Sequence, residues 1–374
     1  MRKYFHFIFF LFLGISTLSA QSIFVKYYNH VLNDTSEQAK PKFVAYPTLA
    51  YSPETNWEVG ISAILVYKAR QDTNNRLSEI QSFSFGTFEQ QYGSWLEHAL
   101  YTHENKYFFL GVVKYQNFPL SYYGIGPNAS SEVNALVHAN EFRFRERILR
   151  KVAGSWYTGF EVDFEHMGKV NFDWESDELT LAEPIGAEGF LDLSLGWGIV
   201  YDDRHNVLNV RDGSFLELAF LSSRKAWGSD FNFNSFFTDF RWYRPIRKNN
   251  VLAVQAYGQF TTGSPPFNQL SLMGGDKLMR GYYTGRYRDN HLTALQVEYR
   301  MLPLPFAKRW GLNLFASTGK VFPTLSDITK ESLVWSAGIG PRFLLFPNKD
   351  VYGRFDIAFT NEGSGIYFFI GEAF

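Results

Sequence analysis

Short segments in which apolar and polar residues alternate recur from residue 43 to residue 374. In 188–203, for example, one face is apolar and the opposite face carries Asp192, Ser194 and two glycines. A period of two residues is typical of a β-strand with one apolar face. We place about sixteen such strands. They are 43–51, 57–68, 77–89, 94–104, 107–118, 137–150, 154–166, 188–203, 214–223, 231–246, 251–262, 290–302, 310–321, 332–346, 350–360 and 364–374.

The lengths of the strands and of their connections indicate a membrane barrel. Most of the strands have about ten residues or more, which a tilted transmembrane strand needs. If the N-terminus is periplasmic, the long connections 119–136, 168–187 and 263–289 face outward, whereas periplasmic turns such as 151–153 are short. A soluble β-sandwich shares the alternation, but this asymmetry is typical of bacterial outer-membrane proteins. We therefore predict an all-β fold, a transmembrane antiparallel β-barrel of about 16 strands.

The composition agrees with this fold and excludes other classes. Aromatic residues make up 18% of the chain, although the mean hydropathy is only -0.20. That combination suits half-polar strands with aromatic girdles. Lys and Arg number 36 and Asp and Glu 37, so the basic stripe expected of a nucleic-acid partner is missing. The chain has no cysteine, and therefore no disulfide and no thiolate ligand or nucleophile.

The N-terminus has the features of a secretory signal. Arg2 and Lys3 precede a mostly apolar stretch at 4–14, which is too short to span a membrane comfortably, and Ala20 offers a small residue for cleavage. Gln21 follows where a lipoprotein would have cysteine. We expect export through a cleaved signal peptide to the bacterial outer membrane. The predicted segments are a signal peptide at 1–20, a short periplasmic segment at 21–42 and the barrel at 43–374.

Two consecutive strands carry opposite charges on their polar faces. A short turn joins 137–150 to 154–166, so these charges should meet across an antiparallel pair inside the barrel. We interpret them as a structural ladder of lumenal ion pairs rather than a transport site, because charges placed there avoid lipid and offset each other. The ladder residues are Arg143, Arg145, Arg147, Glu161, Asp163 and Glu165.

A polar loop at 263–289 joins the eleventh and twelfth strands and contains Gly274-Gly275 followed by Arg280-Gly281-Tyr282. A guanidinium favours a planar partner with several acceptors, and a glycine lets the backbone approach closely. By the tripeptide alone, an ordinary surface loop is the simpler interpretation. Its position between two strands of a predicted barrel favours a folded loop.

At that position, Arg280-Gly281-Tyr282 resembles the Arg-Gly-aromatic motif of the BamA/TamA family of outer-membrane assembly barrels, also called the bacterial surface antigen family. Four weaker matches lie along the barrel at the expected strand positions and in the expected order, and the resemblance covers 43–374. It implies that the loop folds into the lumen and that Arg280 contacts inward residues of the twelfth and thirteenth strands. The weaker matches are 121–127, 203–204, 209–215 and 370–374.

The resemblance assigns roles residue by residue. Glu298 matches the acidic partner of the arginine on the twelfth strand. On the thirteenth strand, Phe315 and Gly319 match the family pattern, but Ser317 stands where the family has an aspartate, which weakens the expected anchoring of the loop. Phe374 matches the terminal aromatic residue that the outer-membrane assembly machinery reads during insertion of the barrel.

Family members that assemble proteins carry periplasmic POTRA repeats before the barrel, and we expect a barrel-only member without them. Without such repeats, the remaining candidate for a functional feature is the closure between the first and last strands of the barrel. Pro47 cannot donate a ladder hydrogen bond, and Gly365 and Gly371 lie in the last predicted strand. These residues indicate either a thin seam or a harmless irregularity.

Catalytic chemistry is not indicated. The 8 histidines show no metal-ligand spacing, and no nucleophile elbow or phosphate-binding loop occurs. We predict no catalytic residue, no metal and no cofactor. The leading hypothesis is a non-enzymatic role in inserting proteins or lipids into the outer membrane. The alternatives are a passive channel or structural protein and, less favoured, a lipid-modifying enzyme using His138 or His291. Membrane lipids are expected partners, and a periplasmic partner or a second copy of the chain stays open.

Overall fold

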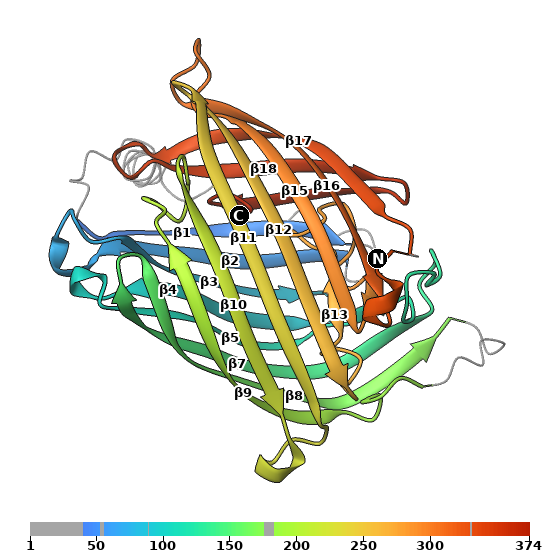
Figure 1. Ribbon diagram of the computed structural model, residues 1–374. Helices are drawn as coiled ribbons and strands as arrows, with labels where there is room; N and C mark the ends of the chain where they lie inside the picture. The colour runs from blue at the N-terminus through green and yellow to red at the C-terminus, as the bar shows by residue number, and fades with distance from the viewer. Residues whose placement is uncertain (1–39, 53–55, 89, 176–182, 330) are drawn as a thin grey trace, which may run out of the picture.

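The computed structural model describes residues 40–52, 56–88, 90–175, 183–329 and 331–374. The predicted signal peptide, and the predicted periplasmic segment up to residue 39, lie outside these residues. A 17-stranded sheet curves around a central space to form a β-barrel (Figure 1), and a 2-stranded sheet lies in one of its loops.

Each predicted strand is present, so the expected all-β barrel of sixteen long strands is confirmed. In the wall, each long strand pairs antiparallel with the next one along the chain. The seventeenth strand, β6 (Leu120–Tyr122), is a short segment that pairs with β7. The long strands are β1 (Lys42–Ser52), β2 (Asn56–Lys68), β3 (Leu77–Thr87), β4 (Tyr92–Tyr101), β5 (Tyr107–Asn117), β7 (Ala135–Ala153), β8 (Trp156–Trp174), β9 (Phe190–Asp202), β10 (Gly213–Ser223), β11 (Phe233–Arg247), β12 (Asn250–Gly263), β15 (His291–Met301), β16 (Trp310–Phe322), β17 (Val334–Phe346), β18 (Val351–Thr360) and β19 (Ser364–Ile370).

Strands β7 and β8 have 19 residues each and are longer than predicted. Their extra length lies mainly at the outer end, where the sequence suggested that a loop begins at residue 168. Phe172 and Trp174 of β8 pack there against Tyr122 and against Phe267 of the long loop. This aromatic cluster gives the extended hairpin a buried face, and the hairpin therefore continues as paired strand beyond the predicted ends.

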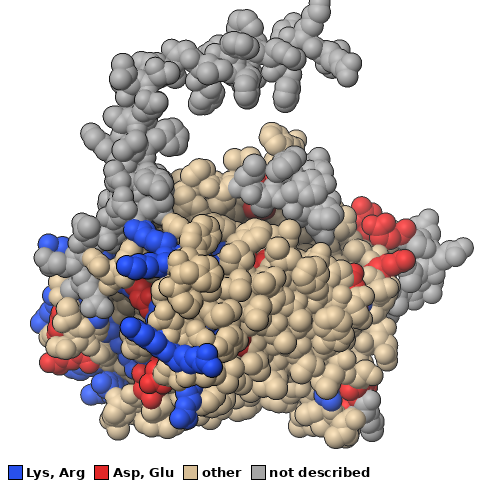
Figure 2. Space-filling view, turned by 90° about the horizontal axis from the view of Figure 1, so that it is seen from above, with Lys and Arg blue, Asp and Glu red and all other residues tan. Residues whose placement is uncertain are grey.

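The barrel is apolar outside and polar inside, the reverse of a soluble protein. On β9, Leu195, Trp197 and Ile199 are 41–45% exposed, whereas Asp192 and Ser194, on the opposite face, are buried. The largest fully buried side chains include four arginines, described below. Figure 2 shows a broad surface with few charges and Lys and Arg gathered toward one end. Such a wall suits hydrocarbon outside and water or protein inside.

No helix in the described ranges is long and apolar enough to cross a membrane.

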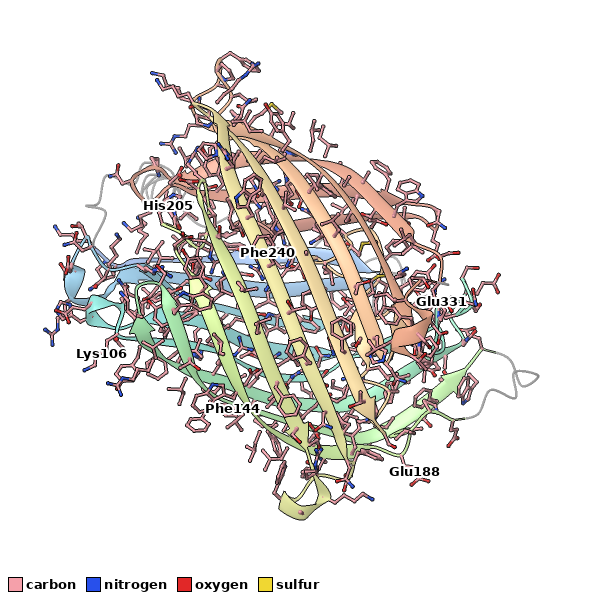
Figure 3. The ribbon with its side chains drawn as sticks, in the orientation of Figure 1. Lys106, Phe144, Glu188, His205, Phe240 and Glu331 are labelled. Atoms are coloured by element: carbon pink, nitrogen blue, oxygen red, sulfur yellow. The ribbon has the colours of Figure 1, made fainter. Side chains whose placement is uncertain are left out.

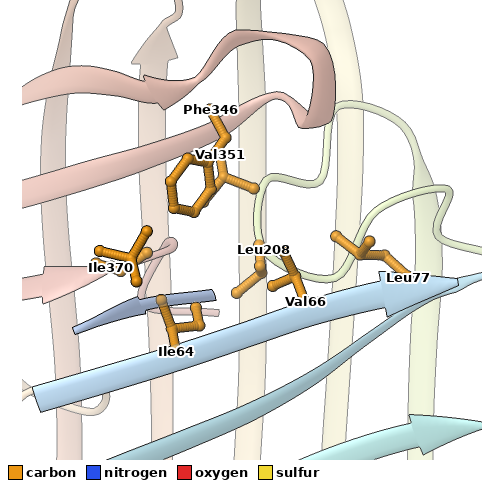
Figure 4. Close-up of a cluster of buried hydrophobic side chains, with 8 residues drawn as sticks. Ile64, Val66, Leu77, Leu208, Phe346, Val351 and Ile370 are labelled. Atoms are coloured by element: carbon orange, nitrogen blue, oxygen red, sulfur yellow. The ribbon is translucent and has the colours of Figure 1, made fainter. Parts of the chain in front are cut away.

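An apolar cluster inside the barrel joins the two ends of the sheet (Figure 4). Val44 of β1 and Ile64 of β2 belong to the same buried cluster as Val351 of β18 and Ile370 of β19. Leu208, from the turn between β9 and β10, lies in it as well. The cluster therefore packs the first and last strands together on the lumenal side.

The last strand is shorter than predicted. β19 ends at Ile370, whereas the alternation suggested a strand continuing to residue 374. Gly371 has a φ of 89°, in the left-handed region that glycine adopts readily, and its N–H donates to the carbonyl of Tyr352 at 2.8 Å. Phe374 is only 4% exposed and belongs to a buried cluster with Tyr243 and Ala253. The chain therefore turns into the lumen after β19.

Candidate functional site

The loop between β12 and β15 is folded into the barrel, as the sequence suggested. It contains the short hairpin β13 (Ser271–Met273) and β14 (Tyr287–Asp289). Met279 and Tyr282 are almost completely buried in a cluster with Leu292 of β15 and Val321 of β16. Burial of these apolar side chains holds the loop against the inner wall.

Glycines let the loop backbone turn and approach its neighbours. Gly274 and Gly275 have φ values of 116° and 121°, and the Gly275 N–H donates to the carbonyl of Tyr282 at 3.0 Å. Gly281 has a φ of 104°, and a Cβ there would lie 2.7 Å from Cγ2 of Thr360 on β18. Only glycine combines this backbone conformation with so close an approach to the wall.

Arg280 is 1% exposed, and its guanidinium contacts side chains of three strands. Its guanidinium forms ion pairs with Glu298 of β15 and with Asp356 of β18, the latter at 2.6 Å between Nη1 and Oδ2. The guanidinium carbon lies 3.7 Å from the ring centroid of Phe315 on β16. Two carboxylates and an aromatic face together satisfy the planar, multidentate preference of an arginine.

The expected contact of Arg280 with Ser317 is absent, and this corrects the sequence interpretation. Ser317 lies on β16 and is buried, but its hydroxyl has no hydrogen-bond partner among the described residues. Arg280 lies over the ring of Phe315 instead, and its second carboxylate comes from Asp356, two strands further along the wall. Gly319 is close to the loop, since a Cβ there would lie 3.0 Å from the sulfur of Met273.

The Arg280 site belongs to a larger buried network of ion pairs that was not predicted from the sequence. Arginines and carboxylates alternate in it, which compensates each buried charge. Arg300 pairs with Glu298 at 2.7 Å, and Arg342 pairs with Asp356 at 2.6 Å. Arg342 also pairs with Glu372 at 3.0 Å, and Arg354 pairs with Asp276 at 3.1 Å. Two longer contacts are Arg354–Asp356 at 3.5 Å and Arg300–Glu372 at 3.9 Å.

Backbone and hydroxyl contacts extend the motif to the last strands. The Gly281 N–H donates to the hydroxyl of Tyr367 on β19 at 2.9 Å. The Tyr282 hydroxyl lies 2.6 Å from Oδ1 of Asn361, in the turn between β18 and β19. Ser336 of β17 donates to the Arg280 carbonyl. The three residues of the motif therefore contact β15, β16, β17, β18 and β19, and also the turn between β18 and β19.

The predicted ladder residues do meet across β7 and β8. Arg143 pairs with Asp163 at 2.6 Å, and Arg147 pairs with Glu161 at 2.7 Å. Arg145 also pairs with Glu161. The register sets Arg143 opposite Glu165, Arg145 opposite Asp163 and Arg147 opposite Glu161.

The ladder also contacts the loop. The carboxylate of Glu165 accepts hydrogen bonds from the side-chain amides of Asn268 and Gln269, each at 2.6 Å. These two residues lie between β12 and β13. The loop is therefore attached to the β8 wall as well as to β15–β19.

Side chains of the first and last strands lie close to each other. Tyr46 of β1 and Phe368 of β19 have ring centroids 6.3 Å apart. Pro47 lies in β1 opposite Ile61 of β2, and Gly365 lies in β19 opposite Ala358 of β18. Gly371, which was expected in the last strand, lies just beyond it.

The terminal aromatic residue is inside the barrel. The Phe374 ring centroid lies 6.3 Å from that of Tyr243, and the Arg300 guanidinium lies 5.2 Å from it. Arg300 also donates to the Phe374 carbonyl oxygen at 2.9 Å. Because β19 ends at Ile370, Phe374 lies beyond the last strand, whereas the sequence predicted a strand over 364–374.

No group of three or more His, Asp or Glu in the described part of the chain is placed to hold a metal ion. The two histidines considered for lipid chemistry lie on different strands. His291 is buried beside Phe260 and Phe322, with ring centroids 5.9 and 5.3 Å away, and His138 is exposed on β7.

Sixteen long strands, an apolar outer wall and a lumenal loop locked by buried ion pairs define an integral outer-membrane β-barrel. The family model of the Omp85 superfamily domain matches residues 74–374, and the chain belongs to this superfamily. The sequence resemblance to BamA/TamA-type barrels is thereby confirmed. No curated protein sequence matches the chain.

Solved structures show the same fold at low sequence identity. BamA from Haemophilus ducreyi lacking POTRA domains 1–3 aligns over 90% of this chain with 15% identity and a TM-score of 0.53. CdiB from Escherichia coli aligns over 90% with 10% identity and a TM-score of 0.56. The chain spans 69% of the BamA structure and 63% of the CdiB structure.

Proposed function

We propose that this barrel assists the insertion of proteins or lipids into the outer membrane through a weak seam between β1 and β19, without catalysing a chemical reaction. The observation that carries the proposal is the length of the last strand. β1 has 11 residues and β19 has 7, so a ladder between them is limited to the shorter strand. A short ladder costs less free energy to separate than a long one.

The direction of the chain supports the same role. After Ile370 the backbone turns into the lumen at Gly371, so residues 371–374 are not available to extend the closing strand. Pro47 in β1 lacks an N–H and can donate no ladder bond. The inward turn lowers the number of backbone hydrogen bonds that the closure can make, and Pro47 removes one donor from β1.

The loop network supports a fixed frame beside this seam. Arg280 and its partners tie the loop to β15 and β18, and Tyr367 extends the contact to β19. A seam next to a rigid wall can open by movement of the β1 side. We expect outer-membrane lipids as partners, the outer-membrane assembly machinery during the barrel's own insertion, and a periplasmic partner or a second copy during function.

The test is a reversible lock of the seam. The chain has no cysteine, so Tyr46→Cys with Phe368→Cys gives one defined pair in the mature protein. The barrel, reconstituted in phospholipid vesicles, is treated with a short reducible thiol cross-linker. The readout is the rate at which a separate, urea-unfolded outer-membrane barrel acquires protease protection in these vesicles.

The control pair is Phe355→Cys with Phe368→Cys, which lie opposite each other on β18 and β19 and do not bridge the seam. We expect the unlocked barrel to accelerate insertion of the unfolded barrel. Cross-linking the seam pair should abolish this acceleration, and cleaving the cross-linker with a reductant should restore it. Cross-linking the control pair should have no effect. Equal acceleration before and after the seam lock would overturn the proposal. A steady ion conductance through the locked barrel would instead favour a passive channel.

A further inference from the structure

The lipid-facing wall formed by β3, β4, β5 and β7 differs in character from the rest of the outer surface. Its outward rows are identified by exposed apolar residues such as Leu96, Val113 and Phe144, and Phe144 projects from the wall in Figure 3. Between them lie small and polar residues. They are Ser82, Ser84, Ser94, His98, Gly111 and Glu146. We call these six residues the polar track.

A histidine–carboxylate pair lies at the periplasmic end of the track. Nε2 of His98 is 3.1 Å from a carboxylate oxygen of Glu146, and these side chains are 14% and 20% exposed. Glu146 belongs to the same outward row of β7 as Phe144 and Ile148, which are 37% and 48% exposed. A carboxylate on a lipid-facing row is costly unless polar groups reach it.

A glycine makes this pair possible. His98 and Glu146 lie on β4 and β7, and each is opposite Gly111 of the intervening strand β5. A Cβ at Gly111 would lie 2.6 Å from Cε1 of His98 and would collide with the Glu146 carboxylate. The two side chains therefore meet across a strand that presents no side chain between them.

The other polar groups continue the track toward the outer end. Ser84 and Ser94 face each other on β3 and β4, with their hydroxyl oxygens 2.8 Å apart. Ser94 and His98 are four residues apart, or about 14 Å along the strand, and Ser82 lies on β3 between their levels. An apolar band of about 25 Å is thus interrupted by polar groups at successive depths.

Both ends of the track are marked by interfacial residues. At the outer end, the rings of Tyr92 and Tyr115 lie 6.2 Å apart, as in an aromatic girdle. At the periplasmic end, Arg150 is exposed on the outward row of Glu146, and Lys106 lies in the adjacent turn (Figure 3). On other parts of the outer wall, Trp197 of β9 and Phe240 of β11 expose large apolar side chains.

We propose that the polar track carries phospholipid head groups across the apolar band, so that the barrel exchanges lipids between the two leaflets. The acyl chains stay in the bilayer while the head group moves along the wall. A zwitterionic head group fits this track: Glu146 accepts from the ammonium group, and His98 and the serine hydroxyls donate to the phosphate. Exchange along this wall does not require β1 and β19 to separate.

The experiment uses the mature barrel reconstituted in vesicles that contain a trace of fluorescent phosphatidylethanolamine. Dithionite added outside bleaches only the outer leaflet unless lipids exchange. With the wild-type barrel, we expect a second phase of bleaching as the inner-leaflet label reaches the outer leaflet. The double variant His98→Leu with Glu146→Leu should lose this second phase. The variant replaces lipid-facing polar groups by apolar ones, and heat-modifiability on gels checks that it remains folded.

Two further variants test whether lipid exchange depends on polar groups at positions 98 and 146 rather than on an intact fold. His98→Asn with Glu146→Gln keeps hydrogen-bonding groups at both positions and should retain lipid exchange. Thr238→Val removes an outward hydroxyl from β11, on a different part of the wall, and should leave the exchange rate unchanged. Exchange that persists in the His98→Leu, Glu146→Leu barrel would overturn the proposal.

The seam lock distinguishes this inference from the proposed insertion activity. With Tyr46→Cys and Phe368→Cys cross-linked, lipid exchange along the track should continue even where protein insertion stops. Loss of exchange on locking would place lipid movement at the seam and overturn the track. A change from oligomer to monomer in the His98→Leu, Glu146→Leu barrel, with exchange intact, would identify the wall as a contact between copies.

Discussion

Arg280 in the loop and Asp356 in β18 form a buried ion pair although 76 residues separate them in the chain. The family resemblance pointed to Glu298 as the acidic partner of this arginine, and to Phe315 and Ser317 on the next strand, with Ser317 a weaker anchor than an aspartate. The structure keeps Glu298 and replaces the serine by a carboxylate from another strand. The loop is thereby anchored on both sides of Phe315, whose ring lies under the guanidinium.

Arg280→Ala should destabilise the folded barrel by about 3–5 kcal/mol, because it leaves two buried carboxylates short of a partner. Urea unfolding in detergent micelles, followed by tryptophan fluorescence, measures the change. Lys277→Ala is the matched control from the same loop. Lys277 pairs with Glu97 at 3.1 Å but is 62% exposed, so its loss should cost less than about 1 kcal/mol. Equal effects of the two variants would contradict the anchoring role of Arg280.

Asp356→Asn and Ser317→Ala should differ strongly. Asp356 neutralises both Arg280 and Arg342, so the asparagine variant should lose about 3–5 kcal/mol of unfolding free energy. The Ser317 hydroxyl has no partner in the described structure, and its removal should change stability by about 1 kcal/mol or less. The same urea titration measures both. A larger loss of unfolding free energy for Ser317→Ala than for Asp356→Asn would indicate that Ser317, and not Asp356, is the second anchor of the loop.

Gly281→Ala should destabilise the barrel more than Gly126→Ala does. Both glycines have positive φ values, 104° and 106°, so both alanines carry a backbone strain of about 1–3 kcal/mol. A Cβ at Gly126 meets nothing within 4 Å, whereas one at Gly281 presses on Thr360. The difference between their melting temperatures therefore measures how tightly the loop packs on β18. Equal melting temperatures would contradict close packing.

Phe374→Ala should lower the stability of the finished barrel by about 3–5 kcal/mol, as expected for removing a buried aromatic side chain. Phe368→Ala, on β19, is the control, since that ring is 58% exposed on the lipid side and its loss should cost less. Unfolding of barrels already inserted and purified separates this effect from any effect on insertion. Equal stability of the Phe374→Ala and wild-type barrels would argue that the ring acts only during assembly.

Much of the fold could be predicted because the alternation of residues reports directly on the wall. The ladder of β7 and β8 could also be predicted, since a short turn fixes which residues of a hairpin face each other. The pairing of Arg280 with Glu298 came from the resemblance, not from spacing.

The rest depends on where the long loop lies inside the barrel. The polar face of 350–360 was visible in the sequence, but nothing local shows that Asp356 lies near a loop residue 76 positions earlier. The inward turn at Gly371 is equally hidden, because a glycine in an alternating run also fits an ordinary strand. The extensions of β7 and β8 depend on packing against Phe267, which is again a long-range contact.

The buried ion pairs of Arg280, Arg300, Arg342 and Arg354 lie along β15–β18, at one side of the closure. On the other side, β1 and β2 meet the last strands through an apolar cluster. Charged contacts of fixed geometry resist sliding, whereas apolar side chains can slip past one another. The wall beside the closure therefore has a stiff side, β15–β18, and a compliant side, β1 and β2, and a lateral load at the closure would deform β1 and β2 first.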